Sequence, residues 1–300
     1  MSNFLKILIA SAVLLSTGTC LAQSDAAVES EQLKIAALEA LISAPPERAL
    51  PIVEKVLSSD GSDELKSRAL FVLSQIDLPE AHSQLAETAR SQSGELQREA
   101  IRMIGISGNR DAIAGLSDIY ASGDADVREA VLEAYLIADD SDALVQIATN
   151  TQDPDEFESA VEMLAAMGAM EQLRALRDRG DMSEVLVDAY AIAGDIESLR
   201  ALASDSSNPE RQQQAVQALG IAGGPEVDAI LVDIYRTADS DDLRQAALEG
   251  MFIAGNEDDV LELFRASEDA EEKRELLEVL VMIGGDAVWD VIDATLDDPQ

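Results

Sequence analysis

A unit of about 30 residues recurs along almost the whole of this chain. Residues 95–125 (ELQREAIRMIGISGNRDAIAGLSDIYASGDA) match residues 210–240 (ERQQQAVQALGIAGGPEVDAILVDIYRTADS), and the segments that begin at Asp126 and Asp241 match each other as well. A fixed period of this size is the sequence pattern of a solenoid, in which each repeat packs mainly against its neighbours. The 300 residues are therefore expected to form one array instead of the two globular domains that the length alone would suggest.

Each repeat has the pattern of two helices joined by a short turn. In residues 241–270, Leu243 and Ala246 begin a stripe of apolar residues at spacings of three and four, which is typical of an amphipathic helix. Residues 255–256 (Gly-Asn) favour a helix end, and the acids at 257–259 favour a new helix start because they face the positive end of its dipole. The predicted fold class is all-α, an α-solenoid of about nine stacked helix-turn-helix repeats.

The predicted solenoid occupies residues 31–300 and follows a short segment at residues 23–30. The repeats begin near Glu31, Glu64, Glu95, Asp126, Asp155, Met182, Glu210, Asp241 and Glu271. The fifth and sixth repeats are short, so more than one placement of their helices stays open. The third and fourth repeats match the seventh and eighth at a nearly constant offset, which indicates that a block of about four repeats was duplicated.

The first 22 residues do not belong to the repeat and have the pattern of a secretory signal peptide. Lys6 supplies a positive charge, residues 7–16 (ILIASAVLLS) are apolar, and small residues lead to a predicted cleavage site after Ala22. The alternative is a lipidated Cys20, although the preceding Thr-Gly-Thr fits a bacterial lipobox poorly. The mature protein is expected in the periplasm or outside the cell, and after cleavage at Ala22 it has no cysteine for disulfides or thiol chemistry.

The chain is strongly acidic, with a formal net charge of −38 at pH 7. Such a surface repels phosphate backbones and anionic lipid headgroups, so nucleic-acid binding and membrane-surface roles are disfavoured. Beyond the signal segment no apolar run is long enough to span a bilayer, so the mature chain is not expected to insert into a membrane. Two interpretations of the acidity remain, namely solubility in a salty compartment and attraction of a basic protein partner.

The first helix of several repeats carries the pattern Arg–x–Ala–aliphatic. It is present at residues 98–101 (REAI), 128–131 (REAV) and 244–247 (RQAA), and each is followed by a turn and by an Ala/Val-rich second helix. This pattern resembles the short HEAT repeats of the phycobilisome-lyase-like type, and the resemblance extends from about Glu31 to the C-terminus. It implies a superhelix of helix pairs whose surface recognises other proteins. The fifth and sixth repeats lack the arginine and depart from the pattern.

The recurring arginines have a structural interpretation that follows from this resemblance. In HEAT-like stacks a first-helix arginine commonly pairs with an acid of a neighbouring repeat, and the resulting ladder fixes the register. The candidates for this ladder are Arg98, Arg128, Arg244 and Arg274, with Asp124, Asp126, Asp239 and Asp241 as candidate partners. Direct contact with a ligand is the alternative role for the same side chains.

Tyr120 and Tyr235 occupy equivalent places in the duplicated block, within LSDIY and LVDIY. Both end second helices, the row that normally lines the concave face of a HEAT-like solenoid. Because tyrosine is enriched at protein interfaces, these two residues are the candidates for contact with a partner. Packing within the core is the alternative.

The sequence offers little for catalysis or for a metal. His82 is the only histidine, which excludes a histidine cluster within one chain, and its place at the start of a helix indicates a solvated residue. Acid-rich turns at 139–142, 239–242 and 257–259 could offer oxygen ligands to calcium, but helix starts favour the same residues and no 12-residue calcium loop is present. No catalytic residue, cofactor or metal site is therefore predicted.

These observations lead to a functional hypothesis. The chain is expected to be a non-enzymatic HEAT-like scaffold that binds another protein or peptide, a basic one if the acidity selects the partner. Two alternatives belong to other classes. One is a lyase or chaperone-like subunit related to phycobilin lyases, and the other is an acidic, calcium-responsive binding protein.

Overall fold

The computed structural model describes residues 29–177 and 183–297. The predicted signal peptide at residues 1–22, with Cys20, lies outside these ranges, as do residues 23–28. The described residues form helices and turns without a strand, which confirms the all-α prediction. None of the helices in the described ranges is long and apolar enough to cross a membrane.

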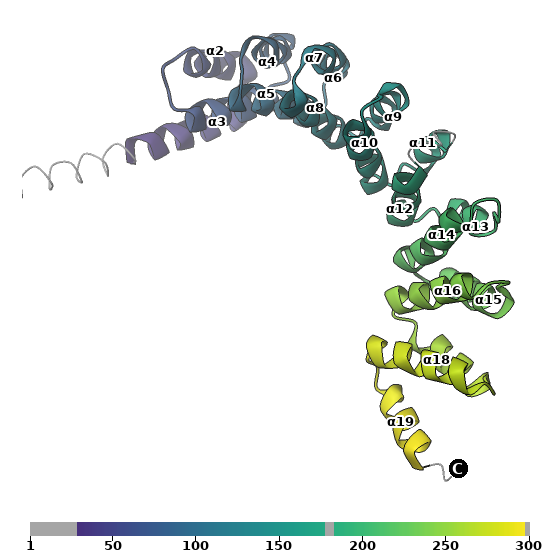
Figure 1. Cartoon of the computed structure of the whole chain (residues 1–300). Helices are drawn as coiled ribbons and strands as arrows, with labels where there is room; N and C mark the ends of the chain where they lie inside the picture. The colour runs from purple at the N-terminus through teal and green to yellow at the C-terminus, as the bar shows by residue number, and fades with distance from the viewer. Residues whose placement is uncertain (1–28, 178–182, 298–300) are drawn as a thin grey trace, which may run out of the picture. The chain divides into compact units, whose positions relative to one another are not determined.

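The described helices follow one another along the chain as pairs (Figure 1). Residues 29–40 are helical and lead into a 3-10 turn, η1 (Leu41–Ser43). The α-helices are α2 (Pro46–Leu57), α3 (Asp63–Ser74), α4 (Pro79–Ser91), α5 (Glu95–Ser107), α6 (Arg110–Ala114), α7 (Leu116–Ser122), α8 (Ala125–Ile137), α9 (Ser141–Asn150), α10 (Pro154–Ala166), α11 (Met170–Ala175), α12 (Ser183–Ala193), α13 (Ile196–Ala203), α14 (Pro209–Ala222), α15 (Pro225–Thr237), α16 (Asp241–Ala254), α17 (Glu257–Ala266), α18 (Ala270–Ile283) and α19 (Ala287–Asp297).

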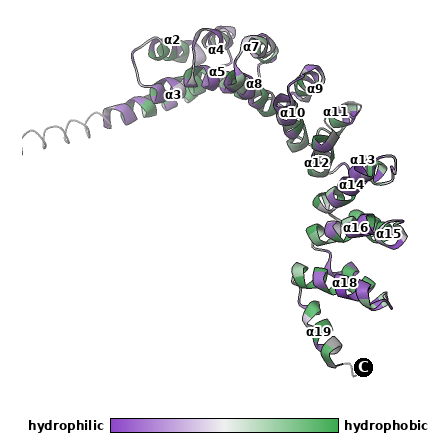
Figure 2. Ribbon diagram, in the orientation of Figure 1, coloured by the Kyte–Doolittle hydropathy of each residue, from purple (hydrophilic) through white to green (hydrophobic). Residues whose placement is uncertain are grey.

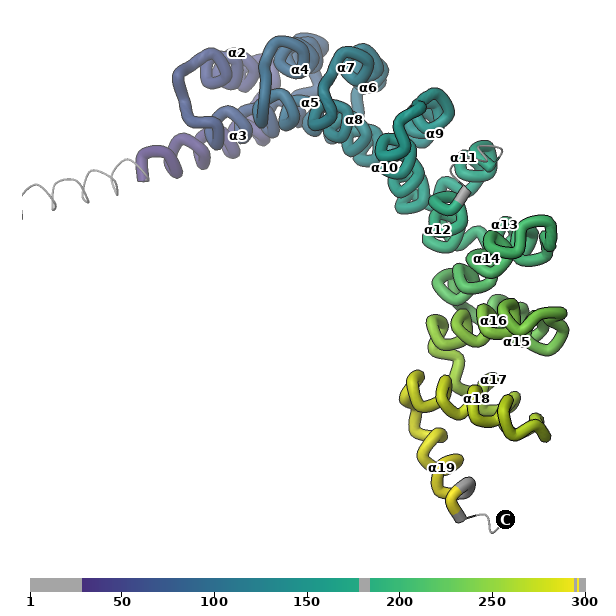
Figure 3. Tube along the Cα trace, in the orientation of Figure 1, coloured from purple at the N-terminus to yellow at the C-terminus, as the bar shows by residue number. Residues whose placement is uncertain are grey.

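The chain divides into two compact bodies, one up to Ala138 and one from Asp139 onward. We call them the N-terminal body and the C-terminal body. In the N-terminal body the first helices of successive repeats, α3, α5 and α8, pack in one row, and α2, α4 and α7 lie beside them in a second row (Figure 1). In the C-terminal body α10, α12, α14, α16 and α18 form the first-helix row, and α9, α11, α13, α15 and α17 form the second-helix row (Figure 3).

Helix starts and ends follow from local chemistry. Asp124 precedes α8 and its side chain accepts a hydrogen bond from the Val127 amide at 3.0 Å, and Ser240 accepts from the amide of Leu243 at 3.2 Å before α16. Such caps satisfy amides that have no partner within the helix. At the other end, Gly255 closes α16 with a φ of +69°, a left-handed conformation that favours glycine.

The first helices approach one another closely at small residues. A Cβ atom on Gly105 of α5 would lie 2.6 Å from the carbonyl oxygen of Ala134 in α8. At the equivalent contact between α14 and α16, a Cβ on Gly220 would overlap the carbonyl oxygen of Gly250. Because these backbones pack without a side chain between them, the spacing of adjacent repeats depends on glycine at these two positions.

A second contact also repeats in both bodies. The Gln97 side-chain amide donates to the carbonyl oxygen of Ala89 at the end of α4, at 2.9 Å, and the Gln212 amide donates to that of Ala203 at the end of α13, at 2.9 Å. Both bonds tie a first helix to the preceding second helix and satisfy a carbonyl at a helix end. The block that is duplicated in the sequence therefore also repeats its packing contacts.

The short fifth and sixth repeats are joined by an ion pair that has one buried partner. Arg174 of α11 donates from Nε and Nη2 to the two carboxylate oxygens of Asp195, at 2.7 and 2.5 Å, and Asp195 is only 1% exposed. The Ser198 hydroxyl and amide also donate to this carboxylate. Burial raises the pKa of Asp195, but the hydrogen bonds from Arg174 and Ser198 outweigh it, so the pKa lies below the usual value.

The close approach of α14 and α16 gives a first prediction. Gly220→Ala should destabilise the protein by about 1–3 kcal/mol, because the added methyl group overlaps the Gly250 carbonyl and forces the helices apart. Urea unfolding followed by circular dichroism measures the change. Gly115→Ala is the control, because its φ of −71° suits alanine and its Cβ would lie no closer than 3.1 Å to the Arg90 side chain and 3.3 Å to the Ala112 carbonyl oxygen. Equal unfolding midpoints for the two variants would contradict the proposed packing constraint.

The ion pair of Asp195 gives a second prediction. Arg174→Met should lower the free energy of unfolding by about 2–4 kcal/mol at neutral pH, because a buried carboxylate loses its counter-charge. A carboxyl whose folded-state pKa is depressed stabilises the fold above its unfolded pKa of about 3.9, and this contribution is lost as the pH falls through the folded value. The difference between wild type and variant should therefore shrink in acid.

The control for that experiment is Arg236→Met in α15. Arg236 pairs with Glu262 of α17 at 3.1 Å, and both side chains are more than half exposed. An exposed ion pair contributes about 0–1 kcal/mol to the free energy of unfolding, so the stability of this variant should differ little from wild type at any pH. A loss in Arg174→Met that is as small as that in Arg236→Met, or that is independent of pH, would show that the Asp195 pair does not stabilise the fold.

Candidate functional site

The arginines of the predicted ladder have different partners. Arg98 bridges to the next repeat, where its Nη1 donates to Oδ2 of Asp126 at 2.9 Å, and it also pairs with Glu95 of its own helix. Arg244 instead pairs with Asp241, three residues earlier in α16, at 3.1 Å. An acid in the first turn of the same helix is the nearer partner there. The structure therefore places Arg98 as the predicted bridge and corrects the expectation of a bridge to a neighbouring repeat for Arg244.

Arg274 and Arg128 are the other two arginines of the predicted ladder. The nearest charge to Arg274 is Glu278, four residues along α18, at 3.9 Å. The guanidinium carbon of Arg128 lies 5.8 Å from the centre of the Tyr120 ring, which is a cation–π distance. The structure thus brings together one predicted ladder residue and one predicted contact residue, and Tyr120 is half-buried under this arginine.

Tyr235, the other predicted contact residue, is buried. Only 3% of it is exposed, and its hydroxyl donates to Oε1 of Glu272 in α18 at 2.9 Å. Burial, followed by the hydrogen bond to Glu272, raises the pKa of the phenol above its usual value. This placement corrects the expectation of partner contact at Tyr235, because the ring joins two repeats and has almost no surface to offer.

Exposed apolar side chains gather on the first helices instead. In the C-terminal body Ile192, Ile221 and Ile253 are 60%, 53% and 48% exposed, and Phe252 and Met282 are also exposed. We call Ile192, Ile221 and Ile253 the isoleucine row. In Figure 2 the ends of α16 and α18 on the left of the view are hydrophobic.

The isoleucine row has a local origin in the sequence. Each of its members stands two residues before a glycine with positive φ, at Gly194, Gly223 and Gly255, within the tripeptide Ile-Ala-Gly. Ile106 and Ile137 of the N-terminal body hold the same place before Gly108 and Asp139 and are also exposed. The recurring tripeptide Ile-Ala-Gly is the sequence pattern from which this surface could have been predicted, because its glycine fixes where the preceding helix ends.

A groove of about 420 Å³ runs along this face between α12, α14 and α16. We call it the α12–α16 groove. Ile221 and Ile253 line it together with carboxylates of Glu184, Asp188 and Glu249. After their first turns these three helices contain no lysine or arginine. The groove therefore combines apolar side chains with uncompensated negative charge, the chemistry of a site for a ligand that is both apolar and cationic.

The lining of this groove includes a polar contact between repeats that the sequence analysis missed. Gln217 of α14 donates from Nε2 to Oε2 of Glu249 in α16, and Gln245 donates to the other oxygen of Glu249. In the N-terminal body the corresponding positions are Arg102 and Glu133, whose side chains lie 3.7 Å apart. An alignment of the two copies of the duplicated block matches Arg102 with Gln217 and Glu133 with Glu249. The contact that joins the two helices at these positions is seen only in the structure.

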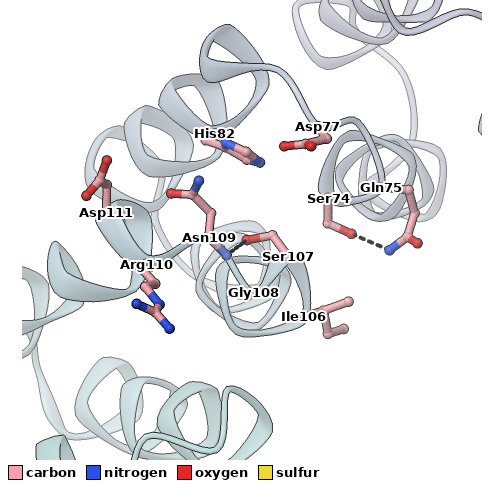
Figure 4. Close-up of a pocket in the computed structure, with 10 residues that line it drawn as sticks. All are labelled: Ser74, Gln75, Asp77, His82, Ile106, Ser107, Gly108, Asn109, Arg110 and Asp111. Atoms are coloured by element: carbon pink, nitrogen blue, oxygen red, sulfur yellow. Dashed lines mark hydrogen bonds between the residues drawn. The ribbon is translucent and has the colours of Figure 1, made fainter.

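A second pocket lies in the N-terminal body and has a different chemistry. Its volume is about 570 Å³, and its lining includes His82 of α4, Asp77 of the preceding loop, and Asn109, Arg110 and Asp111 at the start of α6. Figure 4 shows His82 reaching toward Asp77, with Asn109 and Arg110 on another side of the pocket. His82 is half-buried in the wall of this pocket, less solvated than the sequence interpretation suggested.

The hydroxyl groups of this pocket are not arranged for nucleophilic catalysis. The Ser74 hydroxyl donates to the carbonyl oxygen of Phe71 at 2.7 Å, and that of Ser107 donates to the carbonyl oxygen of Ile104 at 2.7 Å. In the described ranges neither hydroxyl hydrogen-bonds to His82, as an activated serine would. The lining also holds both signs of charge, at Asp77, Asp111 and Arg110, so it presents no single charge to a ligand.

The acid-rich turns act as helix caps. The Asp140 carboxylate accepts from the amide of Ala143 at the start of α9, at 3.1 Å. Asn256 caps α17 by accepting from the amide of Asp259, and Ser240 caps α16. Over residues 29–177 and 183–297, no group of three or more His, Cys, Asp or Glu side chains is placed to hold a metal ion. These caps favour the structural interpretation of the turns over calcium binding.

Comparison with known proteins places this geometry in context. A family model of HEAT repeats matches residues 50–136 and 141–251, which confirms the resemblance found in the Arg–x–Ala pattern. The complex of CpcE and CpcF of phycocyanin lyase from Nostoc sp. PCC7120 is similar at 17% identity and a TM-score of 0.35, over 80% of this chain and 95% of that one. Human deoxyhypusine hydroxylase is similar at 21% identity and a TM-score of 0.35, over 87% and 93%. Among curated proteins no match is found. Likenesses at these identities and TM-scores carry no argument about activity.

The buried hydroxyl of Tyr235 gives a third prediction. Tyr235→Phe should lower the free energy of unfolding by about 0.5–1.5 kcal/mol, because the hydrogen bond to Glu272 is lost. A double-mutant cycle with Glu272→Gln, measured by urea unfolding, isolates the contribution of the pair. Additive effects of the two substitutions would show that this hydrogen bond does not join α15 to α18 in solution.

Proposed function

Because the chain belongs to the HEAT-repeat family, we propose that it is a non-enzymatic scaffold that binds another protein through the first-helix row of its C-terminal body. The observation that carries this proposal is the isoleucine row, three side chains about half exposed at the same place in successive repeats. Exposed apolar surface in a regular arrangement costs solubility, and its presence favours a surface that a partner covers.

The arrangement of this surface suits a protein partner better than a small molecule. Ile192, Ile221 and Ile253 come from three consecutive first helices, α12, α14 and α16, so the apolar surface extends along the array. The α12–α16 groove opens on the same face and adds carboxylate and amide groups beside these isoleucines. Apolar side chains together with polar groups are typical of protein interfaces.

The chemistry of the side chains supports a non-enzymatic role. His82 is the only histidine of the chain, and it lies in the N-terminal body, in a pocket whose serine hydroxyls bond to backbone carbonyls. The α12–α16 groove is lined by carboxylates, amides and aliphatic groups, which offer no activated nucleophile. Binding is therefore the activity that this groove supports best.

The place of action that we propose is the periplasm or the outside of the cell. It rests on the pattern of residues 1–22, a charged start, an apolar run and small residues before Ala22. The acidic composition suits a protein that must stay soluble and unaggregated there.

Site-specific crosslinking tests the binding surface. A photoreactive amino acid placed at Ile221 or Ile253 should form a discrete adduct with another protein in intact cells, because these side chains would contact the partner. The matched control places the same group at Asp233, an exposed residue of α15 in the second-helix row. Adduct formation is read by gel electrophoresis and mass spectrometry. Equal labelling from both rows, or no protein adduct from the first-helix row, would refute the proposal.

Export is tested by the mass of the mature protein. We expect the purified native protein to begin at Gln23, as cleavage after Ala22 requires, and to be recovered from the periplasmic or external fraction. Intact mass spectrometry gives the N-terminus directly. A mass that retains residues 1–22, or a protein that begins at a lipidated Cys20, would contradict this part of the proposal.

A further inference from the structure

We infer that the α12–α16 groove selects a partner segment that is both basic and apolar, with a lysine or arginine beside apolar side chains that cover Ile221 and Ile253. This inference rests on the proposed function, because it names the chemistry of the partner at the same surface.

The charge of the groove is the first step of the argument. The carboxylates of Glu184, Asp188 and Glu249 line it, and the other lining side chains carry no charge. In the described part of the chain, neither Glu184 nor Asp188 forms an ion pair, while Glu249 receives only hydrogen bonds from Gln217 and Gln245. The negative charge of the groove is therefore not neutralised within the C-terminal body.

The duplicated block provides an internal comparison for this charge. In the N-terminal body Arg102, the counterpart of Gln217, bonds to Glu99 at 2.8 Å and lies 3.7 Å from Glu133. Both carboxylates on that face thus have a cation beside them. In the C-terminal body Gln217 takes the place of Arg102, and Glu249 takes the place of Glu133. Glu249 accepts a hydrogen bond from Gln217 but has no cation beside it.

The preceding first helix also differs in charge between the two bodies. In the N-terminal body α3 contributes Arg68, whose guanidinium carbon lies 5.7 Å from the centre of the Phe71 ring. In the C-terminal body α12 contributes Glu184 and Asp188 to the groove and contains no lysine or arginine. In the described part of the chain, the lining of the α12–α16 groove has no cation, whereas Arg102 lies beside Glu99 and Glu133 in the N-terminal body.

Apolar contact and charge together define the occupant. Ile221 and Ile253 line the same groove as the three carboxylates, so a bound segment meets both kinds of group at once. A lysine or arginine with apolar neighbours satisfies both, because its stem covers isoleucine while its cation reaches the carboxylates. A purely apolar segment would leave the carboxylates desolvated without a partner, and an acidic one would be repelled.

Binding of a model peptide tests this inference on the purified mature chain. The probe is a fluorescent helical peptide of about 18 residues with leucines at spacings of three and four and lysines elsewhere, roughly 27 Å long. Two matched peptides replace the lysines by glutamates or the leucines by serines. Fluorescence anisotropy is measured at about 0.15 M NaCl, where charges more than about 8 Å apart are largely screened. We expect only the leucine–lysine peptide to bind.

The decisive variant is Gln217→Arg, which restores the arginine of the other body. It should fold, because the new guanidinium can pair with Glu249 as Arg102 pairs with Glu133, and thermal unfolding checks this. We expect its affinity for the peptide to fall about tenfold, because the cation repels the lysines and occupies the carboxylates. Asp233→Asn on α15 makes the same change in net charge and should alter affinity less than about twofold.

The apolar contribution is tested in the same way. Ile221→Ser should weaken binding by about tenfold, whereas Ile106→Ser, at the equivalent place in the N-terminal body, should leave it unchanged. Equal losses in Gln217→Arg and Asp233→Asn would show that only bulk charge acts, and undiminished binding of the serine-containing peptide would show that the isoleucines do not contribute. Either result would overturn the inference.

The crosslinking experiment separates this inference from the proposed function. An adduct at Ile221 whose attachment site on the partner is flanked by lysine or arginine and apolar residues supports both. An adduct whose attachment site is acidic or lacks basic residues leaves the scaffold function intact and refutes the selection of a basic segment. The absence of any adduct from the isoleucine row refutes the scaffold function itself.

Discussion

The close packing of one first helix against the next is the constraint on which the rest of this structure depends. A pair of short helices cannot bury its apolar side by itself, so each repeat relies on its neighbours for a core. Glycine makes the closest approaches possible, at Gly105 against Ala134 and at Gly220 against Gly250. Hydrogen bonds from Gln97 and Gln212 then hold each of these helices to the preceding second helix. The exposed face of the first-helix row is a consequence of this spacing.

The isoleucine row shows how a local turn produces a feature that extends over several repeats. A glycine with positive φ follows each of the helices α12, α14 and α16 and fixes where that helix ends. The isoleucine two positions earlier is left on the outside at Ile192, Ile221 and Ile253. Because the helices are stacked in register, three separate tripeptides become one surface, which the carboxylates of the α12–α16 groove make suitable for a basic segment.

The sequence was informative about elements and less so about contacts. The period, the Gly and Asp turn signals and the Arg–x–Ala pattern were sufficient to predict the helices, the fold class and the family. The roles of individual side chains were harder to predict. Arg98 bridges to Asp126, but Arg244 turns back to Asp241, because an acid in the same first turn is the nearer partner. Tyr235 is a packing residue because Glu272, two repeats further along the chain, accepts a hydrogen bond from its hydroxyl.

The sequence by itself determined that this chain is a helical solenoid, since the periodicity of apolar residues and the capping residues are local properties. Only the tertiary structure decided which surface is available. Whether Ile221 is core or surface depends on the helix that packs beside it, and whether Glu249 carries an unpaired charge depends on Gln217, 32 positions away in sequence. Contacts of this kind are set by the rotation and spacing of stacked helices, which no single repeat encodes.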